Sequence, residues 1–196
     1  MPETDRSGWV EATRDYKDRQ RHDIARAALD LLTEHGGAGL SMSTLAESAG
    51  ISRPTLYRYY PDLDAVLVGI AQMVAEHDEA FAAMVLADPD PTGQLHTALA
   101  TIAHSAAHTT LAGPALEAAL PPAGRDVLRA HQERVRGLIV DILRSGVQDG
   151  SFAADVDPDT DAGLILGLAG QAQPDHLDRV HHLVGRILHP TEEEEQ

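Results

Sequence analysis

The chain has 196 residues, of which 43% are hydrophobic and 23% are charged, so it can bury a substantial core and is not disordered by composition. It contains no cysteine, which excludes disulfides, zinc–thiolate sites and a cysteine nucleophile. No apolar run reaches membrane-spanning length and the N-terminal residues lack the apolar stretch of a signal peptide, so we expect a soluble, cytoplasmic protein.

The formal net charge of −16 is unevenly distributed along the chain. Residues 17–60 carry six basic and five acidic side chains, whereas residues 61–196 carry seven basic and 22 acidic ones. Charges separated by more than about 8 Å are largely screened at physiological salt. The acidic C-terminal part therefore limits, but does not exclude, contact between residues 17–60 and a polyanion.

Helical periodicity runs through the chain, and the alternation typical of strands is nearly absent. Residues 18–35 carry apolar side chains on one face, and Gly36 follows them as a helix C-terminal signal. The next helix is short, with Ser41 or Ser43 as its N-cap. Gly50 ends it, so two helices are expected before residue 51.

A third helix is expected after Ser52, which has the side chain of an N-cap, with Pro54 in its first turn. Asp62 is expected to cap a fourth helix of about 25 residues, which would measure roughly 37 Å at 1.5 Å per residue. The stretch 87–93, ADPDPTG, ends this helix and begins the next one.

Five more helical segments are expected after the fourth helix. Proline and glycine signals place one helix up to about residue 110 and a short one over 114–120. A long amphipathic stripe covers 123–149, Asp157 is expected to cap a further helix, and the last begins near residue 174. The sequence therefore predicts an all-α protein of roughly nine helices.

The second and third helices, with Gly50 between them, have the spacing of a helix-turn-helix. Ala46 is small enough to let the two helices approach, and Gly50 can adopt the left-handed conformation that such a turn needs. In this motif the second helix enters the major groove with its N-terminal residues near base edges. Arg53 and Arg58 lie on that helix, among the tyrosines.

The segment LSMSTLAESAGISRPTLYRYYPDLDAVL, residues 40–67, resembles the N-terminal DNA-binding domain of the TetR family of transcriptional regulators. The resemblance covers residues 20–67, and residues 143–170 resemble the family's dimerisation helices. It implies an N-terminal three-helix DNA-binding domain and a C-terminal helical domain that binds an effector and dimerises. It also implies that the chain is a homodimeric regulator of operator DNA, most often a repressor released by a small molecule.

Transferred to this sequence, the resemblance gives each residue of the motif an expected role. Arg53 has the fork geometry that reads guanine in the major groove. Tyr57 and Tyr59 resemble the family's aromatic pair, whose polar ends reach phosphates, whereas Tyr60 is expected in the core. The DNA-contacting residues are expected to be Ser43, Thr44, Ser52, Arg53, Pro54, Thr55, Tyr57, Arg58 and Tyr59.

One position departs from the family pattern at the start of the fourth helix. Family members usually carry a phosphate-binding lysine there, whereas this chain reads Pro61-Asp62-Leu63-Asp64. Arg58 or the basic residues 17–21 could replace that anchor. The alternative hypothesis is therefore a TetR-like interaction protein that keeps the fold but has lost autonomous DNA binding.

The C-terminal part is expected to hold the effector pocket and the dimer interface. The pocket is expected to take a cationic or neutral small molecule, since acidic residues lie near it, although ordinary core packing is nearly as good an explanation. Its expected lining is Met73, His77, Phe81, Met84 and His104. The expected dimer contacts are Leu138, Ile142, Leu164, Leu168, Leu183 and Ile187.

The expected organisation has four parts. Residues 1–17 form an N-terminal extension, 18–62 the helix-turn-helix domain, 63–190 the effector-binding and dimerisation domain, and 191–196 an acidic tail.

No motif indicates an enzyme, a cofactor or a metal site. The alternating acids of residues 155–161 resemble a calcium loop, but Thr160 and Leu166 stand where such a loop needs glycine and glutamate. His104 and His108 are four residues apart without an acidic partner at helical spacing, so a metal site is not expected there.

Overall fold

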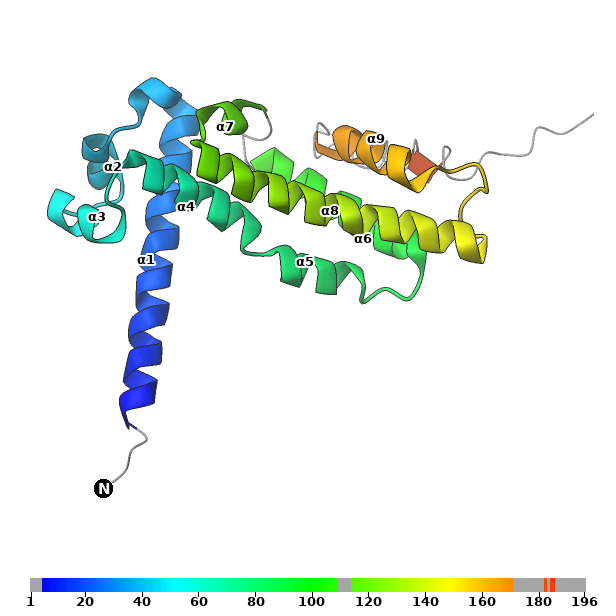
Figure 1. Ribbon diagram of the computed structural model, residues 1–196, viewed down its shortest axis with the longest axis horizontal. Helices are drawn as coiled ribbons and strands as arrows, with labels where there is room; N and C mark the ends of the chain where they lie inside the picture. The colour runs from blue at the N-terminus through cyan, green and yellow to red at the C-terminus, as the bar shows by residue number, and fades with distance from the viewer. Residues whose placement is uncertain (1–4, 109–113, 171–181, 183, 186–196) are drawn as a thin grey trace, which may run out of the picture. The chain divides into compact units, whose positions relative to one another are not determined.

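The computed structural model describes residues 5–108, 114–170, 182 and 184–185, and every element assigned among them is helical (Figure 1). This confirms the expected all-α class. The elements are α1 (Asp5–His35), the 3₁₀ turn η1 (Gly37–Gly39), α2 (Met42–Ser48), α3 (Arg53–Tyr59), α4 (Leu63–Ala75), α5 (Asp78–Val85), α6 (Pro91–His108), α7 (Pro114–Ala119), α8 (Pro122–Asp149) and α9 (Pro158–Gly170).

The helices group into two compact units. The first contains residues 1–76 and 111–129, and the second contains residues 77–110 and 130–196. The expected boundary after residue 62 differs from this grouping, because α4 packs with the N-terminal helices. The functional domains proposed from the sequence stay predictions.

The first unit is built around α1 and α4, which pack against each other where α4 crosses α1 (Figure 1). Its core is formed by aliphatic residues that recur at helical spacing in α1 to α4 and in α7 and α8. Burying such side chains contributes about 1.5–3 kcal/mol each. The most deeply buried members are Ile24, Ala28, Leu45, Leu56, Val66, Ile70 and Ala71.

The first helix begins earlier than the sequence suggested. Apolar periodicity indicated a start near Asp18, whereas α1 begins at Asp5. The intervening stretch has one glycine, Gly8, and no proline, so nothing in it stops helix propagation from residues 18–35. Periodicity located the part of the helix that carries the regular apolar pattern and gave no signal for the part before it.

The fourth helix is shorter than expected, and this expectation was wrong. Instead of about 25 continuous residues, α4 ends at Ala75 and α5 begins at Asp78, with Glu76 and His77 between them. No proline or glycine marks this break. Contacts with a distant part of the sequence accompany this break. The Asp78 carboxylate accepts a hydrogen bond from Arg134 Nε at 2.7 Å and pairs with His131 Nδ1 at 2.6 Å.

The second unit has its own core, formed by α5, α6, α8 and α9. Ile139, Ile142 and Leu143 of α8 are almost completely buried. The turn after α8 brings Phe152 against Gly146, where an added Cβ would lie 2.1 Å from Phe152 Cδ2. Gly146 therefore allows the buried Phe152 ring to lie on the helix backbone.

The start of α9 follows the predicted capping. Asp157 accepts a hydrogen bond from the Thr160 hydroxyl at 2.7 Å and from the Asp159 amide at 3.2 Å. The pKa of the Asp157 carboxyl lies below its usual value, mainly because the carboxylate accepts the hydrogen bond from the Thr160 side chain. The acids that resembled a calcium loop therefore stabilise a helix N-terminus.

Within the described ranges, no helix combines the length and apolar character needed to cross a membrane. The expected last helix, including Leu183 and Ile187, lies largely outside those ranges, as does the 191–196 tail.

Candidate nucleic-acid interface

The turn between α2 and α3 has the geometry that the sequence predicted. Gly50 has a φ of 65°, a conformation that side chains with a Cβ rarely adopt. The chain then reverses so that the Ile51 amide donates to the Ala46 carbonyl at 3.0 Å. Leu45 and Leu56 are fully buried beneath the turn. The two helices are therefore held at a fixed angle by the core on one side and by the glycine on the other.

Serine side chains begin both helices. Ser41, one of the two predicted caps, accepts a hydrogen bond from the Thr44 amide at 3.1 Å, and the Thr44 hydroxyl accepts one from the Ser41 amide at 3.0 Å. Ser52 accepts from the Thr55 amide at 3.2 Å. The predicted caps of α2 and α3 are confirmed, and each contributes about 1 kcal/mol.

These caps use hydroxyl groups that the sequence assigned to DNA. The Thr44 hydroxyl also donates to the Gly39 carbonyl at 2.9 Å, and the Ser52 and Thr55 hydroxyls lie 2.7 Å apart. Their first role is thus to form α2 and α3. A DNA contact by these groups stays a prediction.

The first residue of α3 is linked to α2. A terminal nitrogen of Arg53 donates to the Ser43 hydroxyl, and both side chains belong to the solvent-facing side of the motif. The guanidinium is therefore held at the N-terminal end of α3, the end that approaches base edges in a helix-turn-helix. Pro54 is exposed beside it.

The rest of the exposed surface of α3 carries Tyr57 and Arg58. The Tyr57 side chain is 52% exposed. Neither residue forms a hydrogen bond or ion pair with the residues that the structure describes. Tyr59 is half-buried and packs against the core of the first unit. Tyr57 and Arg58 can thus reach a phosphate without breaking an internal bond.

Tyr60 belongs to the core, as expected. Its side chain is almost completely buried, and its hydroxyl donates to the Arg21 carbonyl at 3.1 Å. Burial raises the pKa of the Tyr60 phenol, and the Arg21 guanidinium, 5.8 Å from the ring centroid, opposes that shift. Arg21 also donates to the Tyr59 carbonyl at 3.4 Å. Arg21 therefore holds the end of α3 against α1.

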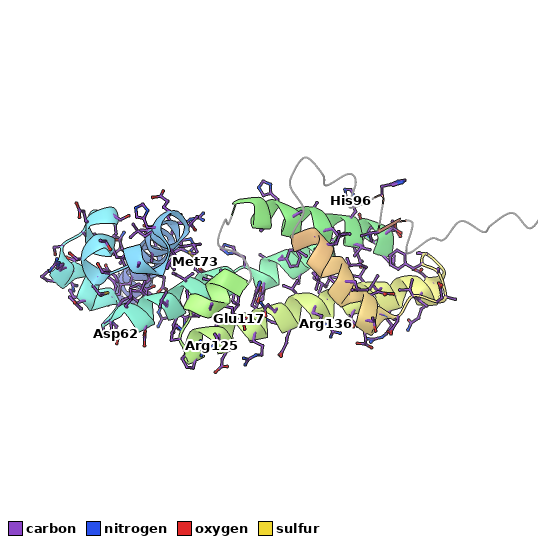
Figure 2. All side chains as sticks on the ribbon, turned by 90° about the horizontal axis from the view of Figure 1, so that it is seen from above. Asp62, Met73, His96, Glu117, Arg125 and Arg136 are labelled. Carbon is purple, nitrogen blue, oxygen red and sulfur yellow. The ribbon has the colours of Figure 1, made fainter. Side chains whose placement is uncertain are left out.

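The acidic start of α4 has a structural reason. Asp62 accepts a hydrogen bond from the Ala65 amide at 2.8 Å and is the N-cap of α4, as predicted (Figure 2). An aspartate here begins the helix more firmly than a lysine would. It also places negative charge beside the recognition helix, together with the exposed Asp64.

These features define the class of the first unit: it is a helix-turn-helix domain with an exposed recognition helix. Residues 24–69 match the model of the family described as bacterial regulatory proteins, tetR family. The match includes all of α2 and α3 and the buried part of α1.

Known proteins with similar sequences are regulators of this kind. The transcriptional repressor LfrR of Mycolicibacterium smegmatis is 36% identical over 89 residues, which are 45% of this chain and 44% of that protein. The class A tetracycline repressor from transposon 1721 in Escherichia coli is 42% identical over 59 residues, 30% of this chain and 27% of that protein. The chain thus spans less than half the length of these curated relatives.

The whole fold is also found among solved structures. FadR from Bacillus subtilis, solved in complex with stearoyl-CoA, aligns with a TM-score of 0.68 and 16% identity over 85% of this chain and 98% of that chain. This likeness extends the shared fold beyond the helix-turn-helix. Residues 24–69 of the chain thus carry the DNA-binding domain described for the tetR family of bacterial regulatory proteins.

The residues expected to line an effector pocket are divided between the two units, and the pocket stays a prediction. Met73 lies in the first unit, whereas the other four lie in the second. His77 sits in the break between α4 and α5, and Met84 and His104 are exposed. Phe81 lines a cavity of about 160 Å³ with Asp78, Arg134 and Leu138 among its walls. The break after Ala75 separates residues that a continuous helix would have aligned.

Some of the residues expected in the dimer interface are buried within the chain, and others are exposed. Ile142 is buried in the core of its own chain and Leu138 packs against that core, so Ile142 is not accessible to a partner. Leu164 and Leu168 of α9 are exposed at 68% and 36%. A Cβ added to the neighbouring Gly163 or Gly167 would meet no atom within 4 Å. Among the expected dimer residues that the structure describes, those on this face of α9 are therefore the most accessible.

Two features of the site escaped the sequence interpretation. Gly69 allows Tyr60 to lie on α4, and Arg21 joins α1 to the end of α3. The sequence did contain a signal for the contact between Gly69 and Tyr60, because a glycine inside an apolar helix often marks close packing. The described residues contain no group of three or more potential metal ligands placed to hold an ion.

Proposed function

We propose that this protein is a sequence-specific DNA-binding transcriptional repressor that acts in the cytoplasm as a homodimer and is released from its operator by a small molecule. The observation that carries the proposal is the exposed outer face of α3, where Arg53, Tyr57 and Arg58 project from a helix fixed by Gly50 and Leu56. Relatives described as repressors support it.

The proposal is tested by a mobility-shift assay. The full chain should retard a fragment carrying the region upstream of its own coding sequence, and an unrelated fragment of equal length should need much more protein. Because phosphate contacts make binding salt-dependent, the assay should be run at two salt concentrations. A folded protein that retards neither fragment at low salt would contradict the proposal.

A second candidate is an interaction protein that keeps the helix-turn-helix without binding DNA. It is favoured by Asp62 and Asp64 at the start of α4, where family members usually carry a phosphate-binding lysine, and by the net charge of −16. The same assay separates the two candidates, since this second one predicts no specific shift at any salt concentration.

Replacing Arg53 with alanine should relax the preference for one base pair in each half-site. A lost bidentate arginine–guanine pair costs about 1–3 kcal/mol of discrimination. The measurement is selection of binding sites from a randomised pool at fixed salt, compared between the variant and the unchanged protein.

Tyr57→Phe is the matched control, because it removes one hydroxyl that we assign to phosphate. It should weaken binding to all sequences alike. If Arg53→Ala also produces a uniform loss, Arg53 holds phosphate and does not read a base.

Leu168→Arg should convert the dimer into a monomer. In a two-fold interface the same face of α9 meets its copy, so each substitution would place two unpaired charges in an apolar contact. Sedimentation velocity measures the outcome. Leu86→Arg is the control, since Leu86 is 55% exposed and directly follows α5, away from α9 in the sequence, and the substitution should leave the dimer intact. A dimeric Leu168→Arg protein would show that the interface lies elsewhere.

A further inference from the structure

The N-terminal part of α1 continues past the point where α4 crosses it (Figure 1). Among residues 14–23, no side chain that the structure describes is buried, and the core begins at Ile24. The helix already begins at Asp5, so about 28 Å of helix precedes the core at 1.5 Å per residue. Core packing therefore does not explain the side chains of this extension.

Three basic residues lie on one face of the extension. Arg14, Lys17 and Arg21 occupy positions i, i+3 and i+7, which share one side of a helix. All three side chains are exposed. Arg14 and Lys17 form no hydrogen bond or ion pair with the residues that the structure describes. These three residues are called the basic stripe below.

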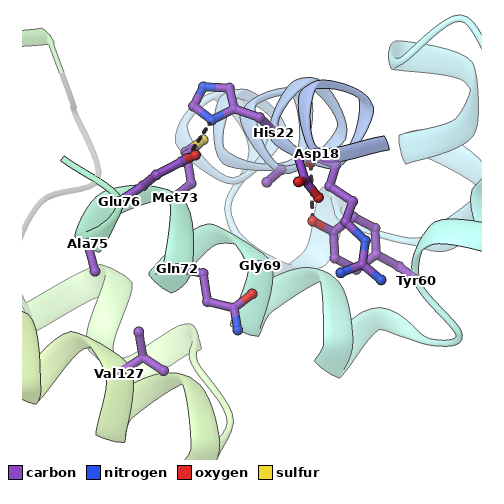
Figure 3. Close-up of a pocket in the computed structure, with 11 residues that line it drawn as sticks. Asp18, His22, Tyr60, Gly69, Gln72, Met73, Ala75, Glu76 and Val127 are labelled. Carbon is purple, nitrogen blue, oxygen red and sulfur yellow. Dashed lines mark hydrogen bonds and ion pairs between the residues drawn. The ribbon is translucent and has the colours of Figure 1, made fainter. Parts of the chain in front are cut away.

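The contacts of Arg21 and its neighbour show which way the basic stripe faces. The Arg21 guanidinium lies 5.8 Å from the centroid of the Tyr60 ring, which packs against α1 directly after α3 (Figure 3). His22, about 100° further round the helix, pairs with Glu76 at the end of α4. Lys17 lies about 40° from Arg21 in the opposite sense. The basic stripe is therefore on the side of α1 turned towards the end of α3.

The basic stripe adjoins the surface proposed to contact DNA. Arg21 donates to the Tyr59 carbonyl at 3.4 Å, and the preceding residue, Arg58, is exposed on the recognition helix. Along the helix axis, Lys17 lies about 6 Å and Arg14 about 10 Å from Arg21. One strand of a DNA duplex carries a phosphate about every 3.4 Å along its axis. The basic stripe is therefore long enough to follow about three phosphates.

The charges around the recognition helix favour an anionic partner for the basic stripe. At the start of α4, Asp62 and Asp64 are both exposed acids, so that side of the helix repels phosphate. One acid, Asp18, borders the basic stripe about 60° from Arg21. Asp18 lies on the side of His22 and lines the cavity between α1, α4 and α8. Positive charge without an internal partner is thus found on the α3 side of α1.

We propose that the basic stripe is a second phosphate-binding surface, which contacts the DNA backbone beside the phosphates that Tyr57 and Arg58 reach. This inference rests on the proposed function and adds a second surface for the same partner. Contacts with phosphate position a protein on the duplex and carry no sequence information. The basic stripe therefore adds affinity and salt dependence, whereas base reading stays with α3.

The double variant Arg14→Ala/Lys17→Ala tests the surface, since alanine preserves the helix. It should bind the operator fragment more weakly and with a shallower salt dependence. Each lost phosphate contact lowers the slope of log K against log salt concentration by about 0.9. The affinity deficit of the double variant should therefore shrink about tenfold between about 50 and 200 mM salt. Fluorescence anisotropy of a labelled fragment measures both quantities, and an unchanged affinity and slope would overturn the proposal.

Arg26→Ala is the matched control for the single variants Arg14→Ala and Lys17→Ala. Arg26 is exposed on the same helix, about 140° from Arg21, and forms no hydrogen bond or ion pair within the described ranges. Its loss removes the same charge and should leave affinity and slope unchanged. An equal loss in all three variants would show that net charge acts without a local contact, and the proposal would be wrong. Arg21 is left unchanged because it holds the end of α3.

Hydroxyl-radical footprinting gives an independent test. The unchanged protein should protect the backbone opposite α3 and a flanking block of nucleotides, and the double variant should lose protection of the flanking block alone. Binding sites selected from a randomised pool should show the same base preference for both proteins. A complete footprint in the double variant, or a lost preference at one base pair, would contradict the assignment.

The failure of this inference is distinguishable from the failure of the proposed function. A folded protein that retards no DNA at low salt would refute the proposed function and, with it, the basic stripe as a DNA contact. A protein that retards its operator fragment, while the double variant retains the same affinity and salt slope, would refute this inference alone.

Discussion

Leu56→Ala should destabilise the first unit by about 2–5 kcal/mol, the range for deleting a fully buried leucine side chain. Leu56 is 0% exposed and is the buried residue of α3. Its side chain attaches the recognition helix to the core, so the variant should lose DNA affinity at temperatures where the unchanged protein still binds. Urea denaturation followed by far-UV circular dichroism gives the stability change.

The matched control for this substitution is Leu86→Ala. Leu86 is 55% exposed, and surface substitutions usually change stability by less than about 0.5 kcal/mol. If Leu56→Ala costs no more than Leu86→Ala, α3 is not anchored by Leu56, and the description of the helix-turn-helix core would be wrong.

Gly69→Ala should destabilise the same unit by about 1–4 kcal/mol, after subtracting the gain of up to about 1 kcal/mol in helix propensity. An added Cβ would lie 2.5 Å from the Tyr60 hydroxyl oxygen and 2.8 Å from its ring. Overpacking of this kind costs about 1–3 kcal/mol. Moving the ring to relieve it would also break the hydrogen bond to the Arg21 carbonyl, which contributes about 1 kcal/mol. The shift in the urea midpoint measures the sum.

Gly137→Ala provides the opposite expectation for the same chemical change. Gly137 lies inside α8, and an added Cβ would meet no atom within 4 Å. Replacing a helical glycine with alanine should then stabilise the protein by up to about 1 kcal/mol. Two variants that move the midpoint in the same direction would show that the contact between Gly69 and Tyr60 does not control stability.

The helix-turn-helix could be predicted in detail because its signals are local. Ser41, Ser52 and Asp62 each cap a helix that begins at the next residue, and Gly50 has the left-handed conformation its position required. These signals depend on hydrogen bonds and steric limits within a few residues. The buried Leu56 and Tyr60 follow from the same short stretch.

The break between α4 and α5 could not be predicted, because its partners are distant in sequence. Glu76 pairs with His22 and Asp78 with His131, separations of 54 and 53 residues. The apolar pattern continues across the break, so periodicity alone favoured one long helix. The expected effector pocket was placed along that helix, and its five residues stay a prediction.

The cavity beside Phe81 was also invisible in the sequence. It is formed by helices that the linear order separates, with Asp78 and Phe81 on α5 and Arg134 and Leu138 on α8. Periodicity identifies which face of a helix is buried and does not identify the helix that covers it.

The bond between Arg53 and Ser43 has a consequence for the thermodynamics of recognition. An arginine side chain loses about 2 kcal/mol of rotamer entropy when it is fixed in one conformation. Because Ser43 already restricts the guanidinium in the free protein, part of that loss occurs on folding and not on association. In the contact that we propose, a guanine would replace the Ser43 hydroxyl as the partner of the guanidinium, and water would bind that hydroxyl. Base reading by Arg53 would then begin from a preorganised side chain, with a smaller entropic penalty than a freely rotating arginine would carry.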